Sequence, residues 1–234
     1  DEVQRATGRA VGACSRRAKY LLFEIEGTGG GLLLHLGMSG SLRVCPADAT
    51  PRKHDHVDIV LDDGNCIRFH DPRRFGMLDW FEAPAGDHPL LRHLGPEPLS
   101  KDFTGAYLKR AAAGRRVAVK NFIMDGKVVV GVGNIYASEA LFMAGIHPTR
   151  PAGRVSATRY DALCQAIRDV LTRAIRSGGT TLRDFLNPES NPGYFAQELL
   201  AYEREGQACF RCSTPIRRKV IGQRSSYYCP RCQR

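Results

Sequence analysis

The chain has 234 residues, enough for one or two domains with a hydrophobic core, and its net charge of +10 favours a polyanionic partner over an acidic one. No apolar run approaches the about twenty residues of a membrane-spanning helix, and no signal-peptide pattern opens the chain. We therefore expect a cytoplasmic protein with no membrane partner. In that compartment four of the cysteines should be reduced, small apolar residues: Cys14, Cys45, Cys66 and Cys164.

The first part of the chain has the pattern of short β-strands separated by turns. After Asp1-Glu2-Val3 it opens in basic, strand-like sequence, and Asp62-Asp-Gly-Asn65 is a hairpin turn whose Asp-Gly suits a positive φ. Such a series of strands predicts a β-sandwich or barrel. The segments expected as strands are residues 19–25, 31–36, 41–45, 57–61, 66–70 and 76–81.

Residues 84–98 are rich in proline, glycine and histidine and predict a domain boundary. Beyond them the apolar period is helical, with one candidate helix at 102–113 and a long one capped at Val155-Ser156 and ended by Gly178-Gly179. One face of the long helix collects its apolar residues, namely Tyr160, Leu163, Cys164, Ile167, Val170, Leu171 and Ile175. Several basic residues suggest that this domain also faces the polyanion, although for any one of them a solvated surface is the commoner role. They are Lys109, Arg110, Arg115, Arg116, Lys120 and Lys127.

Residues 127–134, Lys-Val-Val-Val-Gly-Val-Gly-Asn, precede a helical pattern at 135–141 and imitate a dinucleotide-binding turn. Tyr136 occupies the place of the third glycine, and residues 147–154 hold no acidic residue where a ribose ligand would stand. A dinucleotide fold is therefore rejected. Two glycines and Asn134 ahead of a helix still present N–H groups to an anion, for which a DNA phosphate would serve.

Two Cys-x-x-Cys pairs near the end of the chain, Cys209–Cys212 and Cys229–Cys232, enclose sixteen residues. This spacing is typical of a four-cysteine site for one structural Zn²⁺. The insert predicts a hairpin, with strands at 216–220 and 226–228 and a turn at 221–224. The alternative is a pair of disulfides, which is disfavoured because the other cysteines have no disulfide-like spacing.

The zinc hairpin is strongly basic. Residues 201–234 contain eight Lys or Arg against Glu203 and Glu205, a net charge of +6. Such a charge on a small metal-held hairpin is the signature of a protein that binds a phosphate backbone.

Taken in order, several motifs resemble formamidopyrimidine-DNA glycosylase, and the resemblance covers residues 15–234. The matching stretches are His35-Leu-Gly-Met-Ser-Gly-Ser41, Lys53-His-Asp-His-Val-Asp58, Asp71-Pro-Arg-Arg-Phe-Gly76, Gly131-Val-Gly-Asn-Ile-Tyr-Ala-Ser-Glu139, Gly178-Gly-Thr-Thr-Leu182, Pro192-Gly-Tyr-Phe-Ala-Gln-Glu198 and the zinc finger. The resemblance implies an α+β fold with an N-terminal β-sandwich at 1–96, a helical helix–two-turn–helix domain at 97–200 and a zinc finger at 201–234. It also implies removal of oxidised purines such as 8-oxoguanine, followed by AP lyase β,δ-elimination, in a monomeric bacterial protein that binds damaged or abasic double-stranded DNA.

The resemblance also implies roles for single residues. Met38, Phe75 and Arg73 would together fill the space left by the extruded base. Met38 and Phe75 would act as apolar wedges, and Arg73 would form hydrogen bonds to the orphaned partner base. Without the family, Met38 and Phe75 would more often be buried packing residues. The DNA-backbone contacts would be His54, Arg73, Arg115, Asn134 and Arg224. Lys19 matches the proton donor of the β-elimination, and Arg224 the acid of the δ-elimination.

The chain departs from the family pattern at its start. The family nucleophile is an N-terminal proline followed by a catalytic glutamate, whereas this chain begins Asp1-Glu2, and the opening elements of the first domain are expected to be missing. We therefore expect the chain as printed to bind DNA weakly and not to excise 8-oxoguanine. Smaller departures are Asn121, where proline is frequent, and Glu203, where glycine is usual; neither is expected to touch a proposed site.

Two other readings of the sequence stay open. The first is a zinc-dependent module that binds damaged DNA without cutting it, because the proline is absent. The second is an endonuclease VIII-type glycosylase for oxidised pyrimidines. The motifs at 35–41 and 192–197 favour the purine enzyme.

Overall fold

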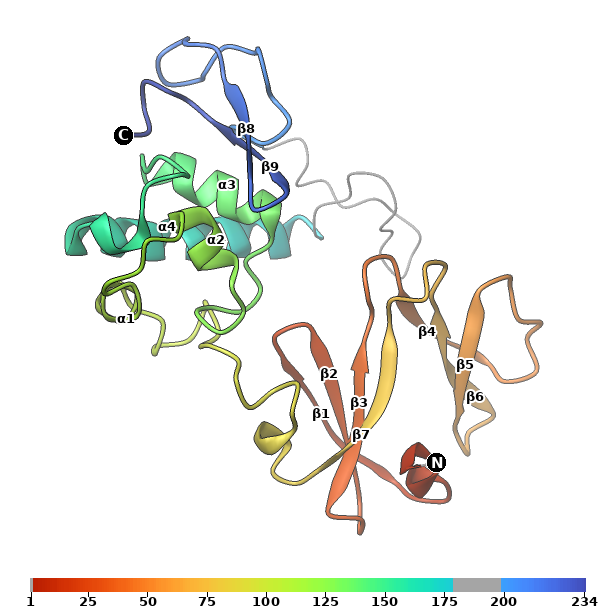
Figure 1. Ribbon diagram of the computed structural model, residues 1–234. Coiled ribbons are helices and arrows are strands. Elements are labelled where there is room, and N and C mark those ends of the chain that lie inside the picture. Colours follow the sequence, from red (N-terminus) through yellow and green to blue (C-terminus); the bar gives the residue numbers. More distant parts are fainter. Residues whose placement is uncertain (1, 179–198) are drawn as a thin grey trace. The chain divides into compact units, whose positions relative to one another are not determined.

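The computed structural model describes residues 2–178 and 199–234, which form two compact units: residues 2–92 in one, and residues 93–178 with 199–234 in the other (Figure 1). The first unit contains the 3-10 helix η1 (Glu2–Ala6), the strands β1 (Val11–Arg17), β2 (Tyr20–Ile25), β3 (Gly30–His35), β4 (Ser41–Pro46), β5 (Asp55–Val60), β6 (Asn65–His70) and β7 (Met77–Glu82), and η2 (Ala85–Asp87). The second contains α1 (Gly105–Ala111), α2 (Val119–Met124), α3 (Asn134–Met143), η3 (Ala152–Arg154), α4 (Ala157–Arg176), β8 (Arg217–Ile221) and β9 (Arg224–Tyr228).

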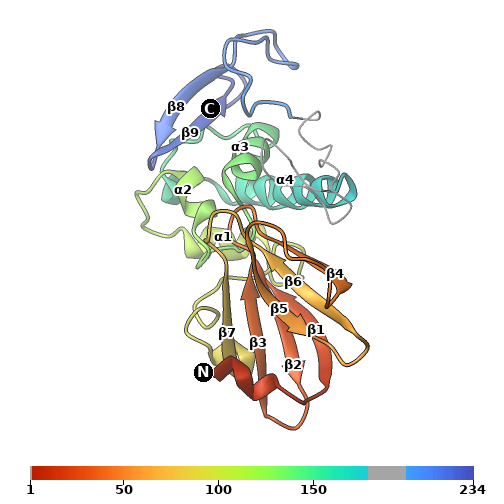
Figure 2. The same ribbon diagram turned by 90° about the vertical axis from the view of Figure 1, so that its right-hand side faces the viewer.

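Two antiparallel sheets make up the first unit, as both views show (Figures 1 and 2). One has the strand order β1-β2-β3-β7 and the other the order β4-β6-β5. A buried cluster of Ile25, Leu32 and Trp80 lies on the first sheet, and Ile59 of the second sheet packs against it. Each sheet therefore contributes apolar side chains from one face to the core.

The opening residues differ from the expectation of strand-like sequence. Glu2–Ala6 forms a 3-10 helix, and only Val11–Arg17 is extended. Val3 and Ala6 of η1 pack against the cluster around Trp80, and Arg5 stacks over the Trp80 ring at 4.6 Å from its centroid. Contacts with a distant strand, which local sequence does not reveal, thus decide the conformation here.

The second unit is built around α4, which the sequence predicted well. Ser156 caps it by accepting a hydrogen bond from the backbone N–H of Arg159, as expected. The predicted apolar face is buried except for Ile175 in the last turn, which is 66% exposed. The helix predicted at 102–113 is shorter, because Thr104 caps it at its start and the backbone turns after Ala112.

Helix α2 has no counterpart among the predicted elements, since six residues are too few to show a helical period. Turns in residues 125–133 join it to α3, and the two helices contact one another in a shared core that also contains α4. The hairpin β8–β9 has the predicted place, with Ile221 paired to Arg224 across its turn. The α+β class is thus confirmed. Among the helices of the described residues, none has the combination of length and apolar character that crossing a bilayer requires.

Candidate nucleic-acid interface and metal centre

The four cysteines of the two predicted pairs converge in the second unit. The sulfur atoms of Cys209, Cys212, Cys229 and Cys232 lie within 4.8 Å of one another, and all four are free thiols. Zinc binds four thiolates at about 2.3 Å in a tetrahedron, which requires sulfur atoms separated by distances of this order. The residues present therefore fit one structural Zn²⁺, and the alternative of two disulfides is not found.

The metal centre lies against the end of α3. Cys209 and Cys229 are buried in a cluster with Ile216 of the finger and Phe142 of α3. Arg211 donates hydrogen bonds to the backbone carbonyls of Phe142 and Met143, the last residues of that helix. The finger is thereby attached to the helix that follows the glycine-rich turn, so zinc would fix the hairpin relative to Asn134.

Lys120 joins this helix to the hairpin. Its ammonium group is fully buried and donates to Asn134 Oδ1 at 2.5 Å, to the hydroxyl of Ser226 at 2.6 Å and to the backbone carbonyl of Ser225 at 3.0 Å. All three N–H donors of the lysine are used. Asn134 in turn donates to the carbonyl of Ser225 at 3.2 Å and to the hydroxyl of Tyr202 at 3.3 Å. Three segments distant in sequence thus meet at one ammonium group.

The charge of Lys120 is not compensated by a nearby carboxylate. Within the described part of the chain, no acidic side chain forms an ion pair with it. Burial lowers the pKa of Lys120 to about 8, with a further contribution from the positive charge of Arg224. Two cations therefore lie close together, and an anion at this place would stabilise both.

Glu139, on the buried side of α3, is used differently. Its carboxylate is fully buried and accepts the backbone N–H groups of Leu200, Ala201 and Tyr202 at 2.8–2.9 Å. These three hydrogen bonds hold the segment that enters the finger and place Tyr202 beside Asn134. Because the Glu139 carboxylate is bonded to these three N–H groups, it does not neutralise the positive charge of Lys120 or Arg224.

Arg224 is exposed and lies at the end of the hairpin turn, next to Gly222 and Gln223, which both have positive φ. A Cβ atom at Gly222 would lie 2.5 Å from the side-chain nitrogen of Asn121 on α2. Asn121 therefore lies against Gly222, in the turn that carries Arg224. Glu203 has a φ of 59°, a left-handed conformation that explains why glycine suits its position.

In the first unit, Met38 and Phe75 are 63% and 57% exposed, so the commoner role of such residues as buried packing does not apply to them. They occupy two neighbouring loops, since a Cβ atom at Gly37 would lie 2.7 Å from the backbone of Phe75. The guanidinium group of Arg73 lies over the Phe75 ring, 5.1 Å from its centroid. The structure thus brings the three residues expected to replace an extruded base onto adjacent loops.

His54 and Lys19 lie elsewhere in this unit. His54 is half-buried with a φ of 76°, and its carbonyl accepts the N–H of Asp71 at the start of the loop that carries Arg73. Lys19 is exposed in the two-residue turn between β1 and β2. It is close enough to His35 to lower the pKa of that imidazole, although burial is the larger cause.

Arg115 is exposed in the loop between α1 and α2, with its guanidinium 5.6 Å from the centroid of the Phe122 ring. Its carbonyl accepts the N–H of Gly153, which fixes the loop to the segment before α4. It is therefore on the same unit as Asn134 and Arg224, but outside the network around Lys120.

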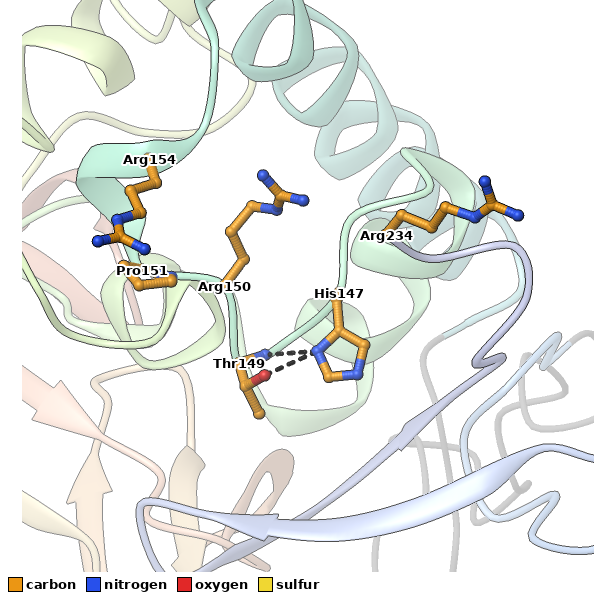
Figure 3. A pocket seen from close by; sticks show the side chains of 6 residues that line it. All are labelled: His147, Thr149, Arg150, Pro151, Arg154 and Arg234. Atoms are coloured by element: carbon orange, nitrogen blue, oxygen red, sulfur yellow. Dashed lines mark hydrogen bonds between the residues drawn. The ribbon is translucent and has the colours of Figure 1, made fainter.

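A separate basic pocket of about 480 Å³ opens near the end of the chain, lined by His147, Thr149, Arg150, Pro151, Arg154 and Arg234 (Figure 3). His147 packs edge-on against Tyr228, which pairs with Arg217 at the end of the hairpin opposite to Arg224. The three guanidinium groups point in different directions, so they do not converge on one anion, and we assign the pocket no ligand.

Sequence reasoning did not single out the residues that organise this network. Lys120 was noted only as one of several basic residues, and Glu139 and Tyr202 only as parts of matching or neighbouring segments. No spacing rule marks Lys120, because its three acceptors lie up to 106 residues away in the chain. The sequence signal that could have revealed Lys120 is a lysine at a position where the neighbouring residues predict burial.

Family models match three stretches of the chain: the formamidopyrimidine-DNA glycosylase N-terminal domain at residues 1–78, the formamidopyrimidine-DNA glycosylase H2TH domain at 94–186, and the zinc finger found in FPG and IleRS at 206–234. A formamidopyrimidine-DNA glycosylase of Syntrophotalea carbinolica is 61% identical over 97% of this chain and 83% of its own length. The MutM (Fpg) structure from Thermus thermophilus aligns with a TM-score of 0.85 at 39% identity, covering 97% of this chain and 84% of that one. The Lactococcus lactis Fpg in complex with abasic-site DNA aligns with the same TM-score at 31% identity, covering 97% and 83%.

A β-sandwich unit, a helix–two-turn–helix core and a four-cysteine finger with a basic hairpin define a zinc-containing protein of the DNA-repair glycosylase class. The identity and coverage of the matches make the assignment more specific. The chain belongs to the formamidopyrimidine-DNA glycosylase family.

Proposed function

We propose that this protein acts in base-excision repair, as a DNA glycosylase for oxidised purines with AP lyase activity. Solved relatives hold DNA containing an abasic site, FAPY-dG or carbocyclic 8-oxoguanine. The partner is accordingly double-stranded DNA with an oxidised or missing base. The protein would act in the cytoplasm, where bacterial DNA is located. The three-part organisation at 1–96, 97–200 and 201–234, and the monomeric state, belong to the same proposal.

The observation that carries the proposal is the pair of cations Lys120 and Arg224 beside the start of α3, to which no acidic residue of the described segments is paired. Gly133 precedes α3 without a side-chain cap, so the positive end of the helix dipole also contributes there. A DNA phosphate would supply an anion to this arrangement. Asn134 and Arg224 would then contact the backbone, and Lys120 would position both while adding its charge.

The loops of the first unit support the removal of a base from the stack. Met38 and Phe75 are exposed apolar side chains on adjacent loops. Exposure of apolar surface to water costs free energy, and these side chains are suited to insertion between bases. Arg73, stacked over Phe75, has a planar set of donors that can bond the orphaned partner base. His54 and Arg115 would contact phosphates and fix the register of the duplex.

Lys19 and Arg224 are proposed as proton donors of the two eliminations. In the β-elimination the bond between C3′ and its oxygen breaks, and an ammonium group held near that oxygen can donate a proton to it. Lys19 is exposed in a tight turn, so its ammonium group is accessible to the DNA phosphate that carries this oxygen. Arg224 would serve the later break at C5′, for which its place at the hairpin turn is suitable.

The proposal is tested by DNA binding. Affinity is measured for one duplex sequence carrying a tetrahydrofuran abasic-site analogue, an 8-oxoguanine, an oxidised pyrimidine or no damage. We expect the abasic and 8-oxoguanine duplexes to bind at least about tenfold more tightly than undamaged DNA. Equal affinity for all four would refute damage recognition, and a preference for the pyrimidine lesion would support the endonuclease VIII-type alternative.

A further inference from the structure

Two cysteines outside the metal centre face each other across the second sheet of the first unit. Cys45 on β4 and Cys66 on β6 are directly opposite in the antiparallel register, and their sulfur atoms are 3.6 Å apart. Residues opposite each other in this way have Cβ atoms about 4.5–5.5 Å apart, close to the separation that a disulfide requires. A bond of about 2.05 Å needs each sulfur to move by less than about 1 Å, which side-chain rotation can supply.

The surroundings of the two thiols are unequal. Cys66 is completely buried, whereas Cys45 is partly exposed at the edge strand of the sheet. The pair shares its face of the sheet with Arg68, whose guanidinium donates to both carboxylate oxygens of Asp58 and to the carbonyl of Ala49. Because Cys66 is buried and Cys45 is partly exposed, an oxidant reaches Cys45 first.

The electrostatics agree with this order. Burial raises the pKa of Cys66, which keeps that thiol protonated and slow to react on its own. Cys45, which is partly exposed, lacks this degree of burial.

We propose that Cys45 and Cys66 are a reversible oxidation site, at which a hydroperoxide converts the two thiols into a cross-strand disulfide. The thiolate of Cys45 attacks one peroxide oxygen, the O–O bond breaks, and a sulfenic acid forms with release of hydroxide. The sulfur of Cys66 then attacks the sulfenic sulfur, and the proton of Cys66 leaves with the hydroxyl group as water. Two thiols lose two electrons and one peroxide is reduced to water, so the exchange balances.

The disulfide would link the edge strand β4 to the central strand β6. The loops that carry Met38 and Arg73 lie beyond the other end of these strands, next to Ser41 and His70, which are also paired. Oxidation would therefore stabilise the sheet that supports both loops, without altering a residue of the proposed DNA interface. This inference is independent of the glycosylase proposal, because it depends only on the two thiols.

The test treats the zinc-loaded protein with one equivalent of hydrogen peroxide and maps its cysteines without reduction. Arg43, Arg52, Lys53 and Arg68 place the two thiols in separate tryptic peptides, residues 44–52 and 54–68. We expect these peptides to be linked after oxidation, to separate on reduction with dithiothreitol, and the first unit to melt roughly 5 °C higher while linked. If zinc is released before the two peptides become linked, the pair has no selective reactivity and the proposal fails.

Two variants test the order of events. In C66S the sulfenic acid of Cys45 has no partner, so dimedone should trap it, whereas the wild-type protein should show little trapping. In C45S the buried Cys66 should react with neither peroxide nor dimedone. C14S, which removes an exposed thiol elsewhere in the unit, should behave as wild type. Dimedone labelling of wild-type Cys45 to the same extent as in C66S would show that the disulfide does not form.

Discussion

The buried ammonium group of Lys120 lies 2.5 Å from the side-chain oxygen of Asn134, the first residue of α3. The same ammonium group bonds to Ser225 and Ser226 on the finger hairpin. One charged group therefore couples the start of a helix to the zinc-held hairpin. The proposed phosphate contacts at Asn134 and Arg224 depend on it for their relative position.

Lys120 should make stability depend on pH. Its pKa falls from the ordinary 10.5 to about 8 in the folded protein, because burial and then Arg224 disfavour the charged form. Below pH 8 the lysine is protonated in both states, and the folded state carries the full cost of the buried charge. Between pH 8 and 10.5 the folded state releases the proton first, so the unfolding free energy should rise with pH, by up to about 3 kcal/mol.

The measurement is urea unfolding of the wild-type protein and of K120M from pH 7 to pH 10.5. The difference between the two proteins should grow in favour of the wild type over this range. K101M changes an exposed lysine of the same unit and serves as the control, because its difference from wild type should not vary with pH. A constant difference for K120M would contradict the lowered pKa.

Arg224→Ala should weaken binding to damaged and undamaged duplexes alike, because a phosphate contact carries no base information. The loss of one contact should reduce the slope of log K against log salt by about one. Arg218→Ala is the matched control, since Arg218 lies on the same hairpin but is paired with Glu205 at 2.9 Å. An unchanged slope with loss of lesion preference would show that Arg224 contacts a base instead.

Met38→Ala and Phe75→Ala should separate recognition from stability. Both side chains are mostly exposed, so the unfolding free energy should change by less than about 0.5 kcal/mol. Affinity for an abasic-site duplex should fall about tenfold, because the wedge that fills the empty space is shortened. Val44→Ala, which truncates another exposed apolar residue of this unit, should affect neither quantity. A large loss of stability would mean that the loops require these side chains for packing.

One zinc ion per chain is expected in protein purified without added metal, as elemental analysis can show. Cys212→Ser should lose it, because the remaining three thiolates no longer complete the tetrahedron. Loss of the metal should also raise amide exchange of residues 217–228 and weaken DNA binding, while the first unit stays folded. Full metal content in the variant would contradict the four-cysteine assignment.

Glu203→Gly should stabilise the second unit. Glu203 has a φ of 59°, which costs a residue with a side chain about 1 kcal/mol and glycine almost nothing. Part of this gain is cancelled by the greater backbone entropy of glycine when unfolded, so an increase of about 0.5 kcal/mol is expected. Glu205→Gly, at a neighbouring exposed position, should instead be destabilising or neutral. A loss of stability on Glu203→Gly would show that its side chain makes a contact that offsets the strain.

Local sequence patterns were sufficient to predict much of the secondary structure and the metal site. The hairpin turn at residues 62–65, the Ser156 cap of α4 and the paired cysteines each express a rule that acts over a few residues, and the structure agrees with them. Such features are readable because backbone hydrogen bonding, capping and tetrahedral metal binding constrain residues close together in sequence.

Other features were decided only by tertiary structure. Whether Met38 is buried or exposed, and whether Lys120 is a surface charge or the centre of a network, depends on which segments meet in space. The same holds for Cys45 and Cys66, since only the register of β4 and β6 places their sulfur atoms in contact. Sequence determines residue types and local periods, but the burial and charge of a side chain depend on distant neighbours, and those neighbours set its chemistry.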